Sequence, residues 1–217
     1  VAIAHSFFDI VDFVQAEQAY ERVLEMTMAG DDSLQAIVDN LAAAIYKQGE
    51  QANLAEDYRS AADHFLRITQ AAPTSEIRPA AEYDAGAALI RLEDWAGAAA
   101  VLEAFREAHP DHELQREATK QIAFVRREEG NFSRAAQEYE RVALEAEDVE
   151  LRGEAMLLAG ELYEDSEQTD RALTVYLAYV AEFPRPIETA VETRFSIAEI
   201  YRTTKDEAAY REQLRNI

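Results

Sequence analysis

Cysteine is absent from this sequence, and glycine and proline are scarce, with seven and five among 217 residues. Without cysteine the chain has neither a disulfide framework nor a thiol nucleophile, and its redox compartment stays open. Few glycines and prolines, beside long stretches rich in alanine, glutamate, leucine and arginine, leave little room for strands and favour a nearly all-helical chain. Because 48% of the residues are hydrophobic, the chain can bury a substantial core.

Basic residues are also few, with 21 Lys and Arg against 43 Asp and Glu, for a net charge of −22. Such a charge opposes binding to nucleic acid or to an anionic bilayer. No stretch approaches the roughly 18 apolar residues of a membrane span. Residues 1–5 lack the basic region of a signal peptide. We interpret the chain as a fragment of a longer protein, whose targeting signal would lie elsewhere.

Signatures of catalysis are missing as well. The sequence contains no HExxH motif, phosphate-binding glycine loop or nucleophile elbow. The one cluster with metal-type side chains is His109-Pro110-Asp111-His112-Glu113. Pro110 interrupts a helix between the two histidines, so the cluster predicts a solvated loop rather than a zinc site. We therefore predict a protein that is not an enzyme, with no cofactor and no metal.

A pattern that recurs every 37 residues organises the chain. An alanine is followed four residues later by a large side chain, as in Ala172 and Tyr176, and the segment ends at Pro184. The same pairs occur at Ala61 and Phe65, Ala98 and Leu102, and Ala135 and Tyr139. A small residue at a fixed step lets two helices approach closely, so the pattern predicts repeated pairs of helices.

The period divides the chain into one array of six units, at about 1–30, 34–73, 79–110, 114–147, 150–184 and 187–217, with about eleven helices. A helix stop is expected at Ala29-Gly30, followed by an N-cap at Ser33. Counted from Gly49, the second unit has about seven extra residues, 50–57, which predicts a longer helix or an expanded turn. On this count the glycine of Gly160-x2-Tyr163 recurs only in the third unit, at Gly86.

These elements, Gly160-x2-Tyr163, the alanine and aromatic pair, and the final proline, resemble the tetratricopeptide repeat. The resemblance implies a right-handed α-solenoid of helix–turn–helix repeats that binds proteins. The loops at Pro73-Thr74-Ser75 and Phe183-Pro184 are similar to those of bacterial envelope members of the family, which implies a periplasmic or outer-membrane-associated protein. A cytoplasmic location is the alternative.

In this family the first helix of each unit lines the concave groove, which implies a scaffold that binds a peptide or protein segment there. Residues 114–134 hold five bases against three acids, whereas residues 138–170 hold twelve acids against two bases. The basic stretch predicts an acidic or C-terminal segment as the partner. The alternative is a structural spacer or oligomerisation segment, with end-to-end self-association. The predicted binding residues are Tyr83, Arg91, Lys120, Phe124, Arg127, Glu154, Glu161, Arg194 and Tyr201.

Overall fold

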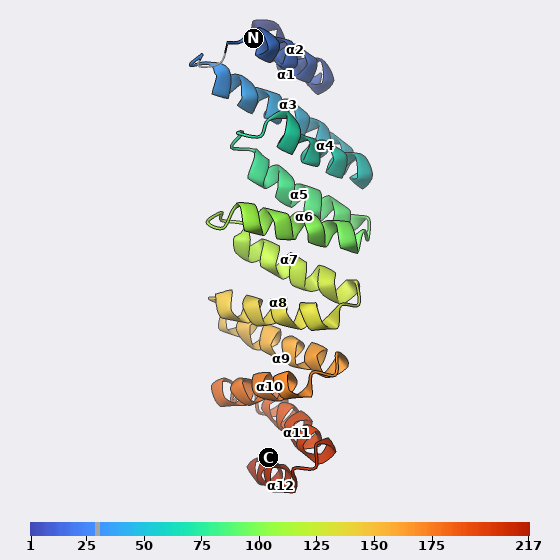
Figure 1. Ribbon diagram of the computed structural model, residues 1–217, viewed down its shortest axis with the longest axis vertical. Coiled ribbons are helices and arrows are strands. Elements are labelled where there is room, and N and C mark those ends of the chain that lie inside the picture. The colour runs from blue at the N-terminus through green and yellow to red at the C-terminus, as the bar shows by residue number, and fades with distance from the viewer. Residues whose placement is uncertain (29–30) are drawn as a thin grey trace. The chain divides into compact units, whose positions relative to one another are not determined.

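The computed structural model describes residues 1–28 and 31–217, and this part of the chain forms twelve α-helices without a strand (Figure 1). The helices are α1 Ala2–Asp9, α2 Phe13–Met26, α3 Leu34–Leu54, α4 Tyr58–Ala71, α5 Arg78–Arg91, α6 Trp95–Ala108, α7 Gln115–Glu128, α8 Phe132–Glu145, α9 Val149–Asp165, α10 Thr169–Glu182, α11 Ile187–Thr203 and α12 Glu207–Asn216. The all-α class is confirmed, with twelve helices in residues 1–28 and 31–217 where about eleven were expected. The predicted stop at Ala29-Gly30 lies outside the described residues.

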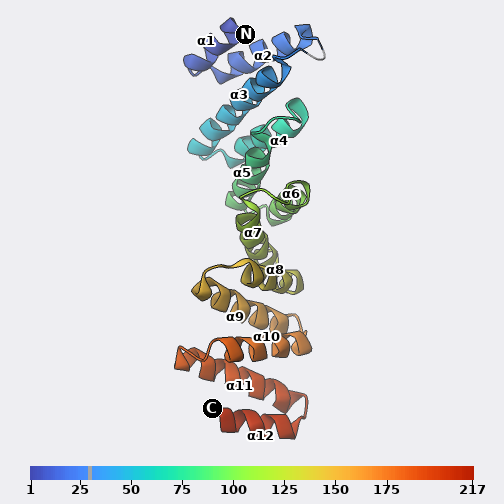
Figure 2. The same cartoon turned by 90° about the vertical axis from the view of Figure 1, so that its left-hand side faces the viewer.

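Two compact units make up the chain, unit 1 at Val1–Ala118 and unit 2 at Thr119–Ile217. Inside each unit, helices that follow one another in sequence pack side by side, as α2, α3, α4, α5 and α6 do in unit 1 (Figures 1 and 2). In unit 2, α8 through α12 pack in the same successive way. Within residues 1–28 and 31–217, no helix is long and apolar enough to cross a membrane.

The turn inside each helix pair has a common construction. Three residues separate the paired helices, and the middle one has a positive φ, as at Glu56, Glu93, Gly130 and Glu167, which are 37 residues apart. The third residue is the N-cap of the next helix, and its side chain accepts a backbone hydrogen bond at Asp57, Asp94 and Asn131 but not at Gln168. The Asp94 carboxylate, for example, accepts from the backbone N–H of Gly97 at 3.1 Å. Local turn chemistry therefore starts each second helix at the same phase of the repeat.

Glycines of three first helices allow close contact with the second helix of the pair. A β-carbon added at Gly49 would lie 2.5 Å from the Phe65 ring, and one at Gly86 would lie 2.6 Å from Leu102. Gly160 meets Tyr176 in the same way. Small residues therefore recur in the first helices as well, at the point where each first helix crosses the second helix of its pair.

Gly49 thus corresponds to Gly86 and Gly160, and the predicted insertion at 50–57 is wrong. The interval from Gly49 to the next helix matches that of the other units, because α3 ends four residues before α4 begins. The additional length of α3, which has 21 residues against 14 in α5, lies at its N-terminal end. Ser33 does not cap α3, because its hydroxyl donates to the Asp31 carboxylate at 2.7 Å.

The core of unit 1 combines apolar residues with buried polar networks. Ala61, Ala98 and Leu102 have no exposed surface, as the repeat pattern requires. Glu82 is 8% exposed and accepts from Arg78 at 2.6 Å and from Thr69 at 3.2 Å, while its second oxygen lies 2.8 Å from His109 Nε2. These contacts join α4, α5 and the end of α6.

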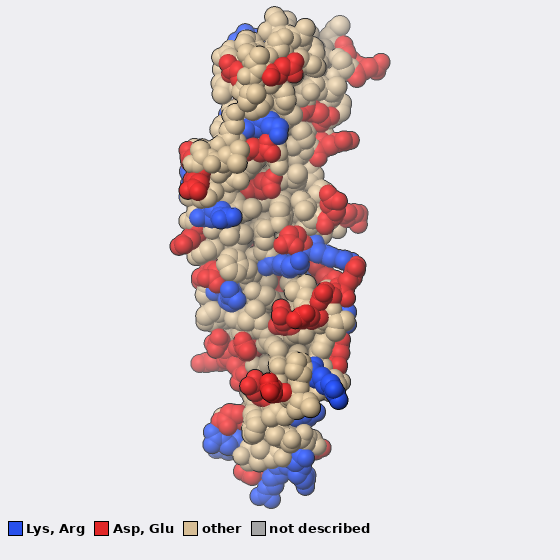
Figure 3. Space-filling view, turned by 180° about the vertical axis from the view of Figure 1, so that it is seen from behind, with Lys and Arg blue, Asp and Glu red and all other residues tan. Residues whose placement is uncertain are grey.

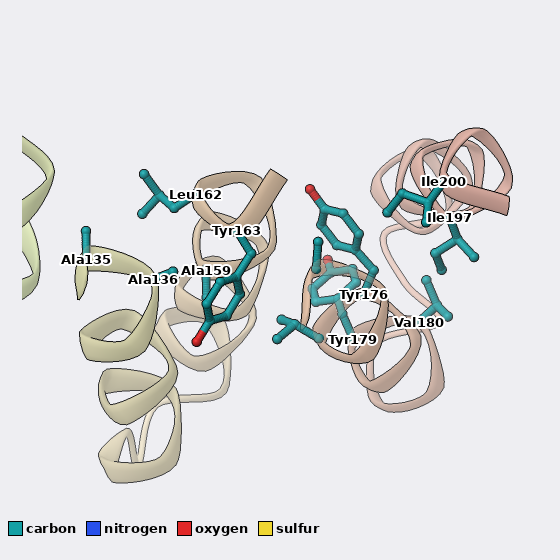
Figure 4. Close-up of a cluster of buried hydrophobic side chains, with 12 residues drawn as sticks. Ala135, Ala136, Ala159, Leu162, Tyr163, Tyr176, Tyr179, Val180, Ile197 and Ile200 are labelled. Atoms are coloured by element: carbon teal, nitrogen blue, oxygen red, sulfur yellow. The ribbon is translucent and has the colours of Figure 1, made fainter. Parts of the chain in front are cut away.

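The core of unit 2 is a cluster rich in tyrosine that extends over α8, α9, α10 and α11 (Figure 4). Tyr163 and Tyr176 are almost completely buried. Their hydroxyls donate to carboxylates, Tyr163 to Glu140 and Tyr176 to Glu164, the latter at 2.7 Å. Each tyrosine thus places its ring in the core and satisfies its polar end at the edge.

Candidate functional site

Each unit has its own candidate site, formed by first-helix side chains at three positions of the 37-residue repeat and called here the first-helix face of that unit. In unit 1 these positions lie on α3 and α5, and in unit 2 they lie on α7, α9 and α11. The first holds Tyr46, Tyr83, Lys120, Leu157 and Arg194; the second Glu50, Ala87, Phe124, Glu161 and Ala198; the third Asn53, Ile90, Arg127, Glu164 and Tyr201.

In unit 1 this face contains a polar pocket of about 250 Å³ between α3 and α5. Its lining residues are Tyr46, Glu50, Asn53, Phe65, Asp84, Ala87, Ala88 and Arg91. The Tyr46 hydroxyl donates to Asp84, and its ring lies 5.1 Å from the ring of Phe65. The predicted residue Arg91 belongs to this pocket.

Burial changes the acidity of the pocket's side chains. Desolvation raises the pKa of Asp84 above its ordinary value, the hydrogen bond from Tyr46 opposes this, and the nearby charge of Glu50 adds to it. The pKa of Tyr46 is raised by desolvation and by its bond to Asp84. Asp84 and Glu50 thus line one pocket, and the charge of each disfavours ionisation of the other.

Tyr83, the other predicted residue of unit 1, contributes to packing. It is partly buried, and its ring lies edge-on to Phe105 with 6.0 Å between centroids. It occupies the same repeat position as Tyr46, whose ring also contacts an aromatic residue of the following helix. This position therefore supports the helix pair from the edge of the face.

On α7, in unit 2, the predicted residues Lys120, Phe124 and Arg127 share one helical face and are partly buried. The Arg127 guanidinium lies over the Phe124 ring, 5.4 Å from its centroid. The same guanidinium donates to Glu128 at 2.9 Å. The structure therefore brings together the basic and aromatic side chains of α7, with one acid beside them.

On α9 the second and third positions are acidic, Glu161 and Glu164, and the first is Leu157. Glu161 is exposed, and its pKa is raised by desolvation and by the charges of Asp165 and Glu164. Glu154 is exposed about two turns earlier and lines a second pocket of about 500 Å³, together with Leu157, Tyr179 and Phe183. Glu154 and Glu161 thus form an acidic row, distinct from the basic face of α7.

On α11, Arg194 and Tyr201 are partly buried. The Arg194 guanidinium donates to the Gln213 side chain of α12 at 3.4 Å, and Tyr201 packs against the tyrosine-rich core. Both predicted residues therefore take part in helix packing. They provide less exposed surface than the repeat phase alone suggested.

Sequence reasoning missed four polar lining residues of the unit 1 pocket, Tyr46, Glu50, Asn53 and Asp84. The 37-residue period could have identified Tyr46, because it lies one period before the predicted residue Tyr83. The predicted insertion at 50–57 treated Glu50 and Asn53 as extra residues, in a longer helix or an expanded turn, and so removed them from the repeat phase.

The histidine cluster lies in a loop, where Pro110, Asp111 and Glu113 are exposed and the two histidines are partly buried. His109 is partly buried against Glu82, and its ring lies 5.3 Å from Phe105. The His112 ring nitrogen accepts from the backbone N–H of Leu114 at 3.2 Å. Across the described part of the chain, no group of three or more His, Cys, Asp or Glu side chains is arranged to hold a metal ion.

Charges on the surface are interspersed, and acids predominate. The face seen in Figure 3 shows red acidic side chains at many points, and blue basic ones in smaller groups. This distribution agrees with the net charge of −22. A partner thus meets a negative field with local basic positions.

Two segments, residues 80–112 and 154–185, match the sequence profile of the tetratricopeptide repeat, one in each unit. The chain thus contains tetratricopeptide repeats, as its sequence resemblance predicted. Proteins built from such repeats serve in general as non-enzymatic scaffolds for protein–protein interaction. Among curated proteins, none matches this chain.

Solved structures show the same fold. A double mutant of MamA RS-1 is 17% identical, with a TM-score of 0.51 over 80% of this chain and 90% of that one. MamA from residue 41 to its end, from Desulfovibrio magneticus RS-1, is 17% identical, with a TM-score of 0.50 over 81% and 92% of the two chains. A Naa15/Naa10 structure bound to HypK-THB is 12% identical, with a TM-score of 0.58 over 98% of this chain and 35% of that one.

Proposed function

We propose that this protein is a non-enzymatic scaffold that holds a peptide or protein segment on the first-helix face of unit 2. The observation that carries the proposal is the arrangement on α7, where Lys120, Phe124 and Arg127 share one face and the Arg127 guanidinium covers the Phe124 ring. In this arrangement the ring provides apolar surface, and the guanidinium held beside it provides charged hydrogen-bond donors.

The chemistry of this α7 face suits an acidic group of the partner. Arginine and lysine bind carboxylates through charge-assisted hydrogen bonds, and aromatic anchors contribute strongly to binding energy. Glu154 and Glu161 on α9 do not suit an acidic segment, so the acidic part of the partner is confined to α7. A partner of mixed charge fits the described face better than a uniformly acidic one.

The test begins with a random peptide library displayed on phage and selected on the immobilised chain. The selected peptides are then measured by fluorescence anisotropy at low salt against the variant Lys120→Glu with Arg127→Glu. We expect the double variant to weaken binding by about tenfold or more, since it reverses two charges at the contact.

The matched control is Arg141→Glu with Arg211→Glu, which reverses two exposed arginines on the second helices α8 and α12. It makes the same change in net charge away from the first-helix face, so it should retain binding. Equal loss in both double variants would mean that only net charge acts. If no peptide is enriched, the scaffold proposal is wrong.

A second candidate is the role of spacer or oligomerisation segment, favoured by exposed apolar side chains on α1 and α2. Ile3 is 71% exposed and Val14 51% exposed. If these residues mediate self-association, light scattering should show a mass that rises with concentration and returns to that of the monomer in the variant Ile3→Glu with Val14→Glu. A monomer at all concentrations would contradict this role.

We also propose a periplasmic or outer-membrane-associated location. Its support is the similarity of the loops at Pro73-Thr74-Ser75 and Phe183-Pro184 to envelope members of the family. Immunodetection in fractionated source cells tests it. The protein should be found with periplasmic or outer-membrane markers, and recovery with cytoplasmic markers would overturn the proposal.

A further inference from the structure

We propose that the pocket between α3 and α5 is a subsite for one basic side chain, the ammonium of lysine or the guanidinium of arginine, supplied by a protein partner. The proposal rests on the proposed function, in that the partner is a peptide or protein. It concerns unit 1 alone and is independent of the α7 face, which lies in unit 2.

The size of the pocket sets the kind of group that it can accept. Its volume of about 250 Å³ lies below the roughly 300–1,000 Å³ of pockets that hold drug-sized ligands or cofactors. A single long side chain fits this space. Phe65, Ala87 and Ala88 provide apolar wall, along which the methylene stem of a lysine or arginine can lie while its charged end reaches a polar partner.

Polar groups of the pocket are suited to a cation. Asp84 and Glu50 provide carboxylate oxygens from two different helices, α5 and α3, and Asn53 adds an amide oxygen at the exposed edge. Tyr46 donates to Asp84 and so leaves its own oxygen lone pairs available as acceptors. Four potential acceptors thus converge on a pocket with room for one charged group.

Within the described residues Asp84 accepts from the Tyr46 hydroxyl and forms no ion pair. Glu50 pairs with Lys47 of the same helix at 2.5 Å, and both side chains are partly exposed. Arg91 lines the pocket, yet no ion pair joins it to Asp84 or Glu50 within the described residues. A cation from a partner would relieve the repulsion between the two carboxylates.

Other occupants suit the pocket less well. A divalent metal requires more carboxylate or histidine ligands than are grouped anywhere in the described residues. An anionic group would meet two carboxylates, with Arg91 lining the pocket and Lys47 already paired with Glu50. The net charge of −22 also favours approach of a basic partner by long-range attraction.

The probe is a pair of blocked pentapeptides, acetyl-Gly-Gly-Lys-Gly-Gly-amide and its neutral analogue with norleucine in place of lysine. Nuclear magnetic resonance of the isotope-labelled full chain reports where each peptide binds. The lysine peptide should shift the amide signals of residues 46–54 and 84–91 in a saturable way. The norleucine peptide should leave these signals unchanged.

Variants separate pocket binding from general charge attraction. Asp84→Asn should weaken binding of the lysine peptide by about fivefold or more, because it removes the charge while keeping an oxygen that accepts from Tyr46. Asp63→Asn makes the same charge change at an exposed position of α4 and should retain binding. Arg91→Ala removes a like charge from the pocket edge and should strengthen binding.

Three results would overturn the subsite: equal shifts with the norleucine peptide, equal weakening in Asp84→Asn and Asp63→Asn, or shifts spread over all acidic surfaces. These outcomes are independent of the phage selection. A failed selection together with specific lysine binding would reject the scaffold and keep the pocket chemistry. A successful selection without lysine binding would reject the subsite alone.

Discussion

In unit 1 the neighbouring helices are joined by buried carboxylates that each accept from several side chains, whereas in unit 2 they are joined by buried tyrosines. Glu82 holds Arg78, Thr69 and His109. Tyr163 and Tyr176 instead fill the core with their rings and donate outward to carboxylates. The two units nevertheless share the same turn, N-cap and small-residue positions. The repeat therefore fixes backbone approach, while the polar chemistry between helices is free to differ.

The largest expected effect is on the network of unit 1. Glu82→Ala should lower the free energy of unfolding by about 3 kcal/mol, because it leaves a partly buried arginine and histidine without their acceptor. Trp95, the single tryptophan, lies in unit 1, so its fluorescence during urea unfolding reports the change. An unchanged midpoint would show that the network adds nothing to stability.

Both units share a close helix contact at a glycine of the first helix, and a larger residue there should destabilise either unit. Gly86→Ala in unit 1 and Gly160→Ala in unit 2 should each cost about 2 kcal/mol by overpacking the helix contact. Gly153→Ala is the control, because an added β-carbon there would meet Phe183 at an ordinary 3.4 Å. Circular dichroism during thermal unfolding measures all three. A cost in only one unit would mean that the two contacts are not equivalent.

A smaller effect is expected from the tyrosines of unit 2. Tyr176→Phe keeps the ring in the core and removes one hydrogen bond to Glu164, so it should cost about 1 kcal/mol. Urea unfolding followed by circular dichroism detects this change. A loss as large as that of Glu82→Ala would remove the proposed difference between the units.

Among the stability variants, the smallest change is expected for a substitution in a turn. Glu93 has a φ of 55°, in the region that glycine occupies in the equivalent turn at Gly130. Glu93→Gly should therefore raise stability by about 0.5 kcal/mol, since relief of backbone strain exceeds the added entropy of the unfolded chain. Gly130→Glu is the reciprocal control and should lower it. Changes of equal sign in the two variants would contradict this account.

Two raised pKa values predict how the stability of each unit changes with pH. Burial raises the pKa of Asp84 in unit 1 and of Glu161 in unit 2, so each folded carboxyl binds its proton more readily than the unfolded one. Stability from these groups is thus greatest at acidic pH and is lost as pH rises through the raised pKa. Asp84→Asn and Glu161→Gln should each flatten this decline in melting temperature. A steeper decline would reverse the assigned sign.

Much of the fold could be predicted because helix pairs repeat their local signals. Ala98, Ala135 and Ala172 are fully buried, as the pattern required. Pro79 lies in the first turn of α5, where its missing N–H is tolerated. The prediction at 50–57 was wrong because the interval from Gly49 to Tyr58 equals that from Gly86 to Trp95, so the second unit has no extra residues there.

The candidate site was less predictable because its residues come from different helices. Lys120, Phe124 and Arg127 could be grouped, since their spacing places them on one face of α7. Tyr46 and Asp84 lie 38 residues apart, and only helix packing brings the hydroxyl to the carboxylate. Arg194 and Tyr201 were assigned to the open face by phase alone, whereas Gln213 and the core of unit 2 cover part of them.

The sequence by itself determined the helices, their pairing and their turns, because capping, helix propensity and small-residue spacing act over a few residues of chain. Only the tertiary structure decided which polar side chains meet, as in the contact of Glu82 with His109 across 27 residues. The physical reason is that hydrogen bonds and desolvation act over a few ångströms in space. The partners of a buried carboxylate are therefore set by how stacked helices align, and the 37-residue period alone does not specify that alignment.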